Sequence, residues 1–501
     1  MSTPATAPLD LREYYRHPGV RARMLQYSGA VEEHPATAVF VAGLRAGSSP
    51  IPTWDHDAER LPMSAIAALW DGGYDIARSL WDRRHLVFLV EIDYQNADAV
   101  GEPFLHPADV FLKLEPSYRA ARRVLSAMGI QPQAIMTGRG YQFTGAIPLT
   151  DPVIDRLADL SPGEPVWHTG VPGRLPTGVS AEMSVTQARA SVGLGLLIEH
   201  VAHLVKKQAD RTSAIPVVFN GTLVGTGLVG REAVSLDFSH AGDPLDIRHF
   251  RAAFSTYQFH RMRPDIVGAS ISGAISPLVA LPRGHRSLMA VLSDGRGLAA
   301  GVRASRTMSA SLPDVAHGVE RLRRHYKQSA LAAFHRTFYR MPVGPIARTT
   351  DVRLVGAPGC VTACLERPND LLLKPGHIQH LVRGLMARRW DPRDIATLVR
   401  AKYQEDHGWG DRWARMDPRT RADFDVRVFA GMVATGLDPL VDFNCVSAQE
   451  KDLCPRTTCR FDLRLDRERL KAFVARRPDP GCGESSTDAS SAGETSPARH
   501  G

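Results

Sequence analysis

The sequence predicts an α+β region followed by an all-α domain, and three observations lead to this fold class. Residues 86–90 are five consecutive apolar residues, mostly β-formers, which predict a buried strand. Residues 185–207 carry apolar side chains at helical spacing and predict a long helix. Beyond about residue 350, Asp391-Pro392 and Asp417-Pro418 each join an N-cap residue to a proline suited to the first turn, so helices are expected there.

The length and charge of the chain limit its class. At 501 residues it is too long for one ordinary core, so several domains are expected. The net charge of +8 makes nucleic acid a plausible partner. We see no 18-residue apolar run and no basic start followed by an apolar block, so we expect no membrane span, no secretory signal and a cytoplasmic location.

The pattern of elements divides the chain into four parts. Within the α+β part we expect a helix over 114–128 that ends at Gly129, and strands over 133–136, up to 147, over 215–219 and over 233–238. Residues 225–230 form a formal GxGxxG, but a strand follows, so a hairpin turn is the better interpretation than a dinucleotide site. The predicted parts are a helical extension (1–80), the α+β module (81–345), a helical domain (346–475) and a disordered tail (476–501).

Two carboxylates stand at the predicted end of the first strand. Side chains alternate along a strand, so Glu91 and Asp93 share one face. Like charges this close repel unless a cation lies between them, and Mg²⁺ binds one or two carboxylates in many nucleotide enzymes. Two solvated acids at a strand end remain the alternative.

A third carboxylate, Asp237, ends the strand predicted over 233–238. Arg248 and Arg251 follow it, and arginine presents a planar fork of donors suited to phosphate. Three carboxylates with arginines nearby are the layout for two-metal nucleotidyl transfer. A surface loop with a structural Arg–Asp pair remains the alternative.

The segment 137–143 places two glycines around an arginine between two strands. Gly138 and Gly140 would let the backbone approach a ligand phosphate, and Arg139 would bind it. An ordinary hairpin is the alternative.

These pieces, in this order, resemble the archaeo-eukaryotic primase superfamily, which includes the primase small subunit and PrimPol enzymes. The resemblance covers roughly residues 80–265 and implies an RRM-like sheet with helices. It also implies Mg²⁺ or Mn²⁺ at Glu91, Asp93 and Asp237. The residues it assigns to nucleotide binding are Thr137, Gly138, Arg139, Gly140, Gln142, Arg248, Arg251 and Ser255.

The chain departs from this family pattern at three positions. Glu91 stands where the first motif usually begins with Asp, and Gln142 stands where the second usually ends in His. Phe259 occupies a position that is usually basic, with His260 and Arg261 just after it. Displacing a catalytic carboxylate by about 1 Å can cost orders of magnitude in rate. A weakened or inactive module is therefore the alternative.

Five cysteines lie in the predicted helical domain. Thiolates select zinc or iron–sulfur clusters, and buried free cysteines are the alternative. The spacing around Cys454-Pro455 resembles the iron–sulfur domain of the primase large subunit, over about 350–465, which implies a [4Fe-4S] cluster with zinc as the alternative. Four of the five would be ligands, with Cys360 or Cys364 as the first; the five are Cys360, Cys364, Cys445, Cys454 and Cys459.

Together the resemblances imply a single-chain fusion that makes or extends primers from nucleoside triphosphates on a single-stranded DNA template, with a helicase or other replication protein as a further partner. The second hypothesis is a nucleic-acid-binding protein that has lost its chemistry. A nucleotide-dependent ligase or nuclease is a third, and the absence of a Lys-x-Asp-Gly motif argues against the ligase.

Overall fold

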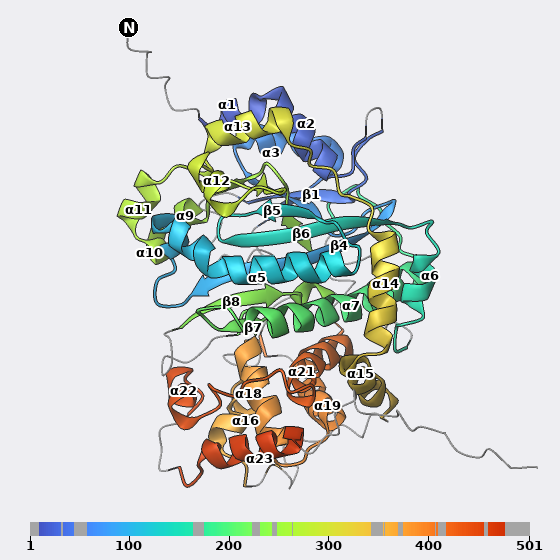
Figure 1. Ribbon diagram of the computed structural model, residues 1–501, viewed down its shortest axis with the longest axis vertical. Helices are drawn as coiled ribbons and strands as arrows, with labels where there is room; N and C mark the ends of the chain where they lie inside the picture. The colour runs from blue at the N-terminus through green and yellow to red at the C-terminus, as the bar shows by residue number, and fades with distance from the viewer. Residues whose placement is uncertain are drawn as a thin grey trace, which may run out of the picture.

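The computed structural model combines β-sheets with many helices, which confirms the α+β class (Figure 1). The structure describes residues 10–31, 34–44, 58–163, 175–222, 231–242, 248–262, 264–341, 354, 356–368, 374–405, 407–408, 417–454 and 459–475. The 225–230 glycines, Cys482 and the predicted tail lie outside these residues.

A six-stranded sheet forms the centre of the molecule, in the order β12-β5-β6-β4-β8-β7. The apolar run 86–90 lies in its longest strand, β4, which continues past the two acids to Asn96, so Glu91 and Asp93 lie inside the strand and not at its end. The strands are β4 (His85–Asn96), β5 (Gln133–Met136), β6 (Gly140–Pro148), β7 (Val217–Phe219), β8 (Glu232–Asp237) and β12 (Leu281–Pro282).

The β7–β8 connection corrects one prediction. The two strands pair in parallel, with Val217 opposite Val234, whereas a hairpin requires antiparallel strands. The chain therefore does not make a simple hairpin between them, although a strand does follow the glycine-rich segment as expected.

Two helices cover one face of the central sheet: α5 (Pro107–Ala127) and α7 (Val185–Ala209). The even-numbered side chains of β4 pack beneath them, from Phe88 to Tyr94. Gly129, with φ of 75°, follows α5 in the left-handed conformation expected of a helix cap. By length and composition α7 could cross a membrane, but 78% of its most apolar window is buried inside the protein, as in a core helix.

The opposite face of the sheet packs against the N-terminal region. This region was predicted to be helical, but it also contains strands. Its strands β1 to β3 join β9 in a second sheet, ordered β2-β1-β3-β9. Val87 and Leu89 of β4 lie in the core beneath it, so Glu91 and Asp93 point toward this side. The elements are α1 (Leu11–Arg16), α2 (Pro18–Tyr27), β1 (Phe40–Leu44), β2 (Glu59–Pro62), η1 (Met63–Ala65), α3 (Ile66–Gly72), β3 (Asp75–Ser79) and β9 (His249–Arg251).

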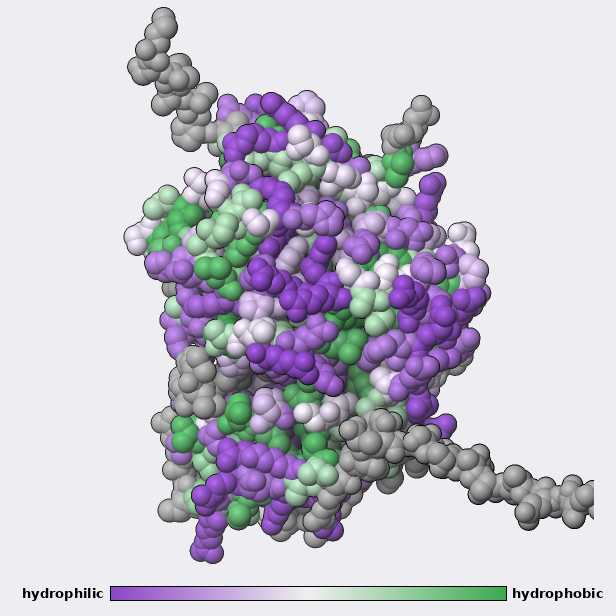
Figure 2. Space-filling model, in the orientation of Figure 1, coloured by the Kyte–Doolittle hydropathy of each residue, from purple (hydrophilic) through white to green (hydrophobic). Residues whose placement is uncertain are grey.

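Short elements complete the module around the two sheets. Figure 2 shows hydrophobic side chains gathered over α10 and α11, which belong to a small cluster around Phe104 and Tyr257. The remaining elements are α4 (Glu102–Leu105), α6 (Val153–Ala158), η2 (Ser239–Gly242), β10 (Thr256–Tyr257), α9 (Phe259–Met262), α10 (Pro264–Val267), α11 (Ala269–Ala274), β11 (Leu278–Val279), α12 (Leu288–Ser293), α13 (Leu298–Thr307), α14 (Ala316–Lys327) and α15 (Ala330–Arg340).

The described residues from 359 to 475 contain helices and no strands, as predicted. Asp391 and Asp417 cap two of these helices through their side chains, each followed by proline in the first turn. This helical domain packs below α7 in Figure 1. Its helices are α16 (Gly359–Glu366), α18 (Pro375–Met386), α19 (Pro392–Tyr403), α21 (Pro418–Ala434), α22 (Cys445–Glu450) and α23 (Leu463–Ala475).

Candidate active site

Strand register brings the three predicted acids together. Glu91 of β4 lies directly opposite Asp237 of β8 on one side and opposite Gln142 of β6 on the other. Asp93 lies two residues further along the same face of β4. Residues paired across antiparallel strands have side chains about 5 Å apart, so backbone hydrogen bonds fix this grouping.

The acids line a cavity of about 160 Å³ that also contains the arginines expected from the sequence. The cavity has positive charge from Arg139, Arg248 and Arg251. Its complete lining is Leu80, Leu89, Glu91, Asp93, Thr137, Arg139, Gln142, Asp237, His240, Arg248, His249, Phe250, Arg251 and Tyr257.

Each acid has a different partner. The Gln142 amide nitrogen donates to Glu91 Oε1 at 2.7 Å. Asp93 Oδ2 lies 3.7 Å from the Arg139 guanidinium. Asp237 Oδ1 accepts hydrogen bonds from the Ser239 backbone nitrogen at 2.9 Å and from its hydroxyl at 2.7 Å. All three carboxylates are therefore held in place by neighbouring groups.

The closeness of the three carboxylates contributes to raised pKa values for Glu91 and Asp93. Burial, with the charges of Asp93 and Asp237, raises the pKa of Glu91 to about 8. Burial also raises the pKa of Asp93, and the nearby Arg139 partly opposes this shift. The arginines thus compensate the three carboxylates only in part, which suits a site that takes up a cation.

The described residues contain no group of three or more His, Cys, Asp or Glu side chains arranged to hold a metal ion as they stand. The donor set itself fits Mg²⁺ or Mn²⁺, because three carboxylates supply oxygen ligands within one cavity.

The two glycines of the 137–140 loop lie in close contact with neighbouring parts of the protein, and their predicted approach to a phosphate stays a prediction. A Cβ atom at Gly138 would collide with the Tyr257 ring, and one at Gly140 would collide with the Ile92 carbonyl oxygen. The glycines therefore allow close packing of the loop against the protein itself, which leaves Thr137 and Arg139 of this loop lining the cavity.

The arginines differ in how freely they could bind phosphate. Arg251 forms a buried ion pair with Asp75 at 3.0 Å and lies over the Tyr257 ring. Arg248 donates to the Ser239 hydroxyl at 2.8 Å. The Arg139 side chain is 38% exposed, against 3% for the Arg251 side chain, so Arg139 is the more accessible of these two to a phosphate.

Ser255 does not line the cavity, which corrects its assignment to nucleotide binding. Its hydroxyl accepts a hydrogen bond from the Ile76 nitrogen at 2.6 Å and donates to the Thr256 carbonyl. Ser255 is completely buried and joins β3 to the β9–β10 turn.

Phe259 stands at the position expected to be basic, and neither it nor the neighbouring His260 and Arg261 line the cavity. Phe259 packs in the small apolar cluster, and the His260 ring lies 2.9 Å from the Ile275 carbonyl. Tyr257 and His240, by contrast, line the cavity and were missed. For His240 the signal was its position three residues after Asp237; no sequence pattern marked Tyr257.

A second group of predicted ligands lies in the helical domain, around a cavity of about 540 Å³. The cysteines that line it are Cys360, Cys445, Cys454 and Cys459. Cys364 does not line it; burial raises the pKa of both Cys360 and Cys364 to about 12, but only Cys360 is influenced by the other three thiols. Of these two thiols, therefore, only Cys360 shares the cavity with Cys445, Cys454 and Cys459, and four thiols are a donor set that would suit a cluster or zinc.

Comparisons with known proteins add little to this geometry. No protein-family model matches the chain, and no curated protein matches it. Among solved structures, the polymerase domain of Mycobacterium tuberculosis Ligase D in complex with DNA is similar at 15% identity and a TM-score of 0.31, over 65% of this chain and 98% of that one. A similarity of this size carries no argument for function, which has to be inferred from the cavities.

Proposed function

We propose that this chain is a nucleotidyltransferase that makes or extends primers on single-stranded DNA. The observation that carries the proposal is the meeting of Glu91, Asp93 and Asp237 with three arginines in one cavity, because this combination matches the needs of metal-assisted phosphoryl transfer.

The chain's own residues have separable tasks in this proposal. Glu91, Asp93 and Asp237 would hold Mg²⁺ or Mn²⁺. When bound, the ions would activate the attacking 3′-hydroxyl and neutralise the leaving pyrophosphate. Arg139 and Arg248 would bind the triphosphate, as guanidinium groups do. Gln142 and Ser239 keep two of the carboxylates oriented through their hydrogen bonds.

The test is nucleotide incorporation on single-stranded DNA, with Mg²⁺ or Mn²⁺ and with or without a primer. Asp93→Ala/Asp237→Ala should lower incorporation by at least about 100-fold, since transition-state charge stabilisation is lost. Asp98→Ala/Asp294→Ala removes two exposed acids and is the matched control. Folded parent protein that incorporates no nucleotide would refute the proposal.

The second candidate is a nucleic-acid-binding protein without catalysis. The hydrogen bond from Gln142 to Glu91, with the raised pKa of Glu91, favours it because both weaken that carboxylate as a metal ligand. DNA binding that equals the parent's in Asp93→Ala/Asp237→Ala, with no incorporation by either protein, is the result expected of it.

For the helical domain we propose a [4Fe-4S] cluster held by Cys360, Cys445, Cys454 and Cys459. Such a cluster would link α16, α22 and the segment before α23. Cys360→Ser should lose iron and sulfide, whereas Cys364→Ser, at an equally buried position on the same helix, should keep both. Elemental analysis of each protein checks this. Zinc without sulfide would replace the cluster by a zinc site, and equal loss in both variants would contradict the assignment of Cys360.

A further inference from the structure

A second cavity adjoins the candidate active site. It has a volume of about 390 Å³, within the range of about 300–1,000 Å³ that is usual for small-molecule sites. Leu80 and His240 line both this cavity and the one that contains the three acids. The two cavities are therefore neighbours with a common wall.

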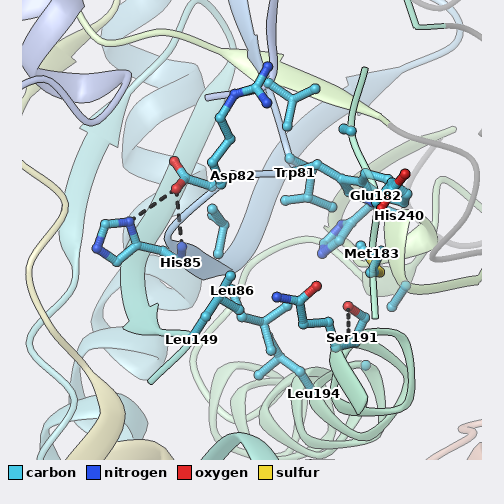
Figure 3. Close-up of a pocket in the computed structure, with 18 of the residues that line it drawn as sticks. Trp81, Asp82, His85, Leu86, Leu149, Glu182, Met183, Ser191, Leu194 and His240 are labelled. Carbon is cyan, nitrogen blue, oxygen red and sulfur yellow. Dashed lines mark hydrogen bonds and ion pairs between the residues drawn. The ribbon is translucent and has the colours of Figure 1, made fainter. Parts of the chain in front are cut away.

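The walls of this second cavity come from four parts of the module (Figure 3). Trp81 lies just before β4 and Leu86 at its beginning, and Leu149 follows β6. Leu194 projects from α7, and Met183 belongs to the segment before that helix. Most of the surface around the hollow is thus apolar, with one aromatic ring, which suits a flat ligand with little charge.

Most polar groups at this cavity already have partners within the protein. Asp82 accepts hydrogen bonds from Arg78 at 2.8 Å and from Thr37 at 2.7 Å. Arg83 donates to the Ser180 carbonyl at 3.2 Å and so fastens the segment before α7 across the cavity. These groups shape the walls and offer little to a ligand.

His240 differs from these groups because it is buried, whereas Glu182, which also lines the cavity and has no partner among the described residues, is exposed. It is 7% exposed and projects into the cavity in Figure 3. Neither ring nitrogen makes a hydrogen bond of normal geometry with the described residues, although the Leu89 backbone lies near enough to interact weakly with the ring. Burial lowers the pKa of His240 to about 4, so the ring is neutral at pH 7 and presents one donor and one acceptor. Leaving a buried polar group without a full hydrogen-bond partner is unfavourable, and a ligand that offers both a donor and an acceptor would relieve this.

We propose that this cavity binds an unpaired nucleobase, with His240 bonded to the base edge and the attached phosphate directed toward the arginines of the active site. Nucleobases combine flat apolar faces with adjacent donors and acceptors at their edges. The base would come from a nucleoside triphosphate or from the DNA strand. The inference rests on the proposed function only in taking a nucleotide or DNA as the ligand.

The test measures binding of the full chain without turnover, in two arms. The first compares a nucleoside triphosphate with inorganic tripolyphosphate in Mg²⁺. The second compares single-stranded DNA with the same strand carrying one abasic position, moved stepwise along it. Loss of the base should weaken binding by about 5- to 100-fold in the arm that matches the true source.

Three variants connect that preference to the cavity. Ser191→Phe fills the hollow from α7 and should reduce the preference for a base to less than about 2-fold. Thr186→Phe adds the same ring on an exposed position of α7 and should behave as the parent. His240→Phe keeps the ring shape and should lower the preference by about 2- to 10-fold.

Binding that is independent of the base in both arms overturns the inference, as does a base preference that survives Ser191→Phe. The result is separable from the proposed function. A protein that prefers the base but incorporates no nucleotide upholds this inference and refutes the proposed function, and incorporation without a base preference does the reverse.

Discussion

Glu91 and Glu199 lie in surroundings that shift the pKa values of their carboxyl groups in opposite directions. Glu91, in the candidate active-site cavity, has its pKa raised to about 8 by burial and by two neighbouring acids. Glu199, on α7, has its pKa lowered to about 2, since Arg427 and His335 outweigh the cost of burial. Arg427 lies 2.8 Å from Glu199, and His335 lies 3.1 Å from it on the other side.

The difference distinguishes an ion pair that holds two parts of the protein together from a candidate active site. Glu199 belongs to the module, whereas Arg427 belongs to α21 of the helical domain, so their ion pair connects the two parts. The charges there are satisfied within the protein. Around Glu91 they are not, and unsatisfied buried charge is typical of functional sites.

The largest expected effect on stability comes from removing the ion pair between Arg427 and Glu199. Arg427→Met should lower the free energy of unfolding by about 3–5 kcal/mol, because it leaves the Glu199 charge buried without its main partner. Urea denaturation measures this. Arg231→Met removes an exposed ion pair with Asp98 and should cost less than about 1 kcal/mol. Equal effects of the two substitutions would show that the buried pair has no special role.

A smaller effect of opposite sign is expected at the active site. Asp237→Asn removes one of the carboxylates clustered in this cavity and relieves repulsion among them, so without divalent metal it should stabilise the protein by about 0.5–2 kcal/mol. Mn²⁺ should then stabilise the parent but not the variant, since binding to the folded state raises its stability. Thermal unfolding with chelator and with Mn²⁺ checks both points. Asp98→Asn, on the surface, should show neither change.

The smallest expected effect is a pH dependence. Because the pKa of Glu91 is raised, its contribution is complete below about pH 4.5 and is lost as the pH rises toward 8. Between pH 5 and 8 the full shift corresponds to about 4 kcal/mol, but Glu91 is partly exposed and solvent screens it, so in chelator the parent should lose on the order of 1 kcal/mol relative to Glu91→Gln over this range. Glu199 acts oppositely: its contribution is present above about pH 4.5 and is lost as the pH falls toward 2. A flat difference between parent and Glu91→Gln would contradict the assigned surroundings.

The sequence predicted the acid cluster well because local rules determine it. Alternation along β4 puts Glu91 and Asp93 on one face, and an apolar strand that ends in Asp237 is easily recognised. Packing between distant segments is not visible in such patterns. Tyr257 reaches the cavity because Gly138 lets its ring approach, and Ser255 turns away to bind the β3 backbone.

The cysteines show the same limit. Cys360 and Cys364 lie one helical turn apart and fit the spacing equally well, so only the packing of α16 on its neighbours determines which of them lines the cavity. The strands of the N-terminal region were missed for a similar reason. They are short, and β1 and β3 complete a sheet with β9, which lies more than 160 residues further along the chain.

Helix α7 has a consequence for how the molecule moves. Its 25 residues span about 37 Å at 1.5 Å per residue. Near its beginning, Ser191 and Leu194 line the proposed nucleobase cavity; further along, Glu199 is bonded to the helical domain, and Lys206 donates to the Val217 carbonyl at the edge of the sheet. One helix therefore connects the cysteine-containing domain to the wall of a cavity beside the three clustered acids, so a displacement of that domain along α7 would change the shape of this cavity.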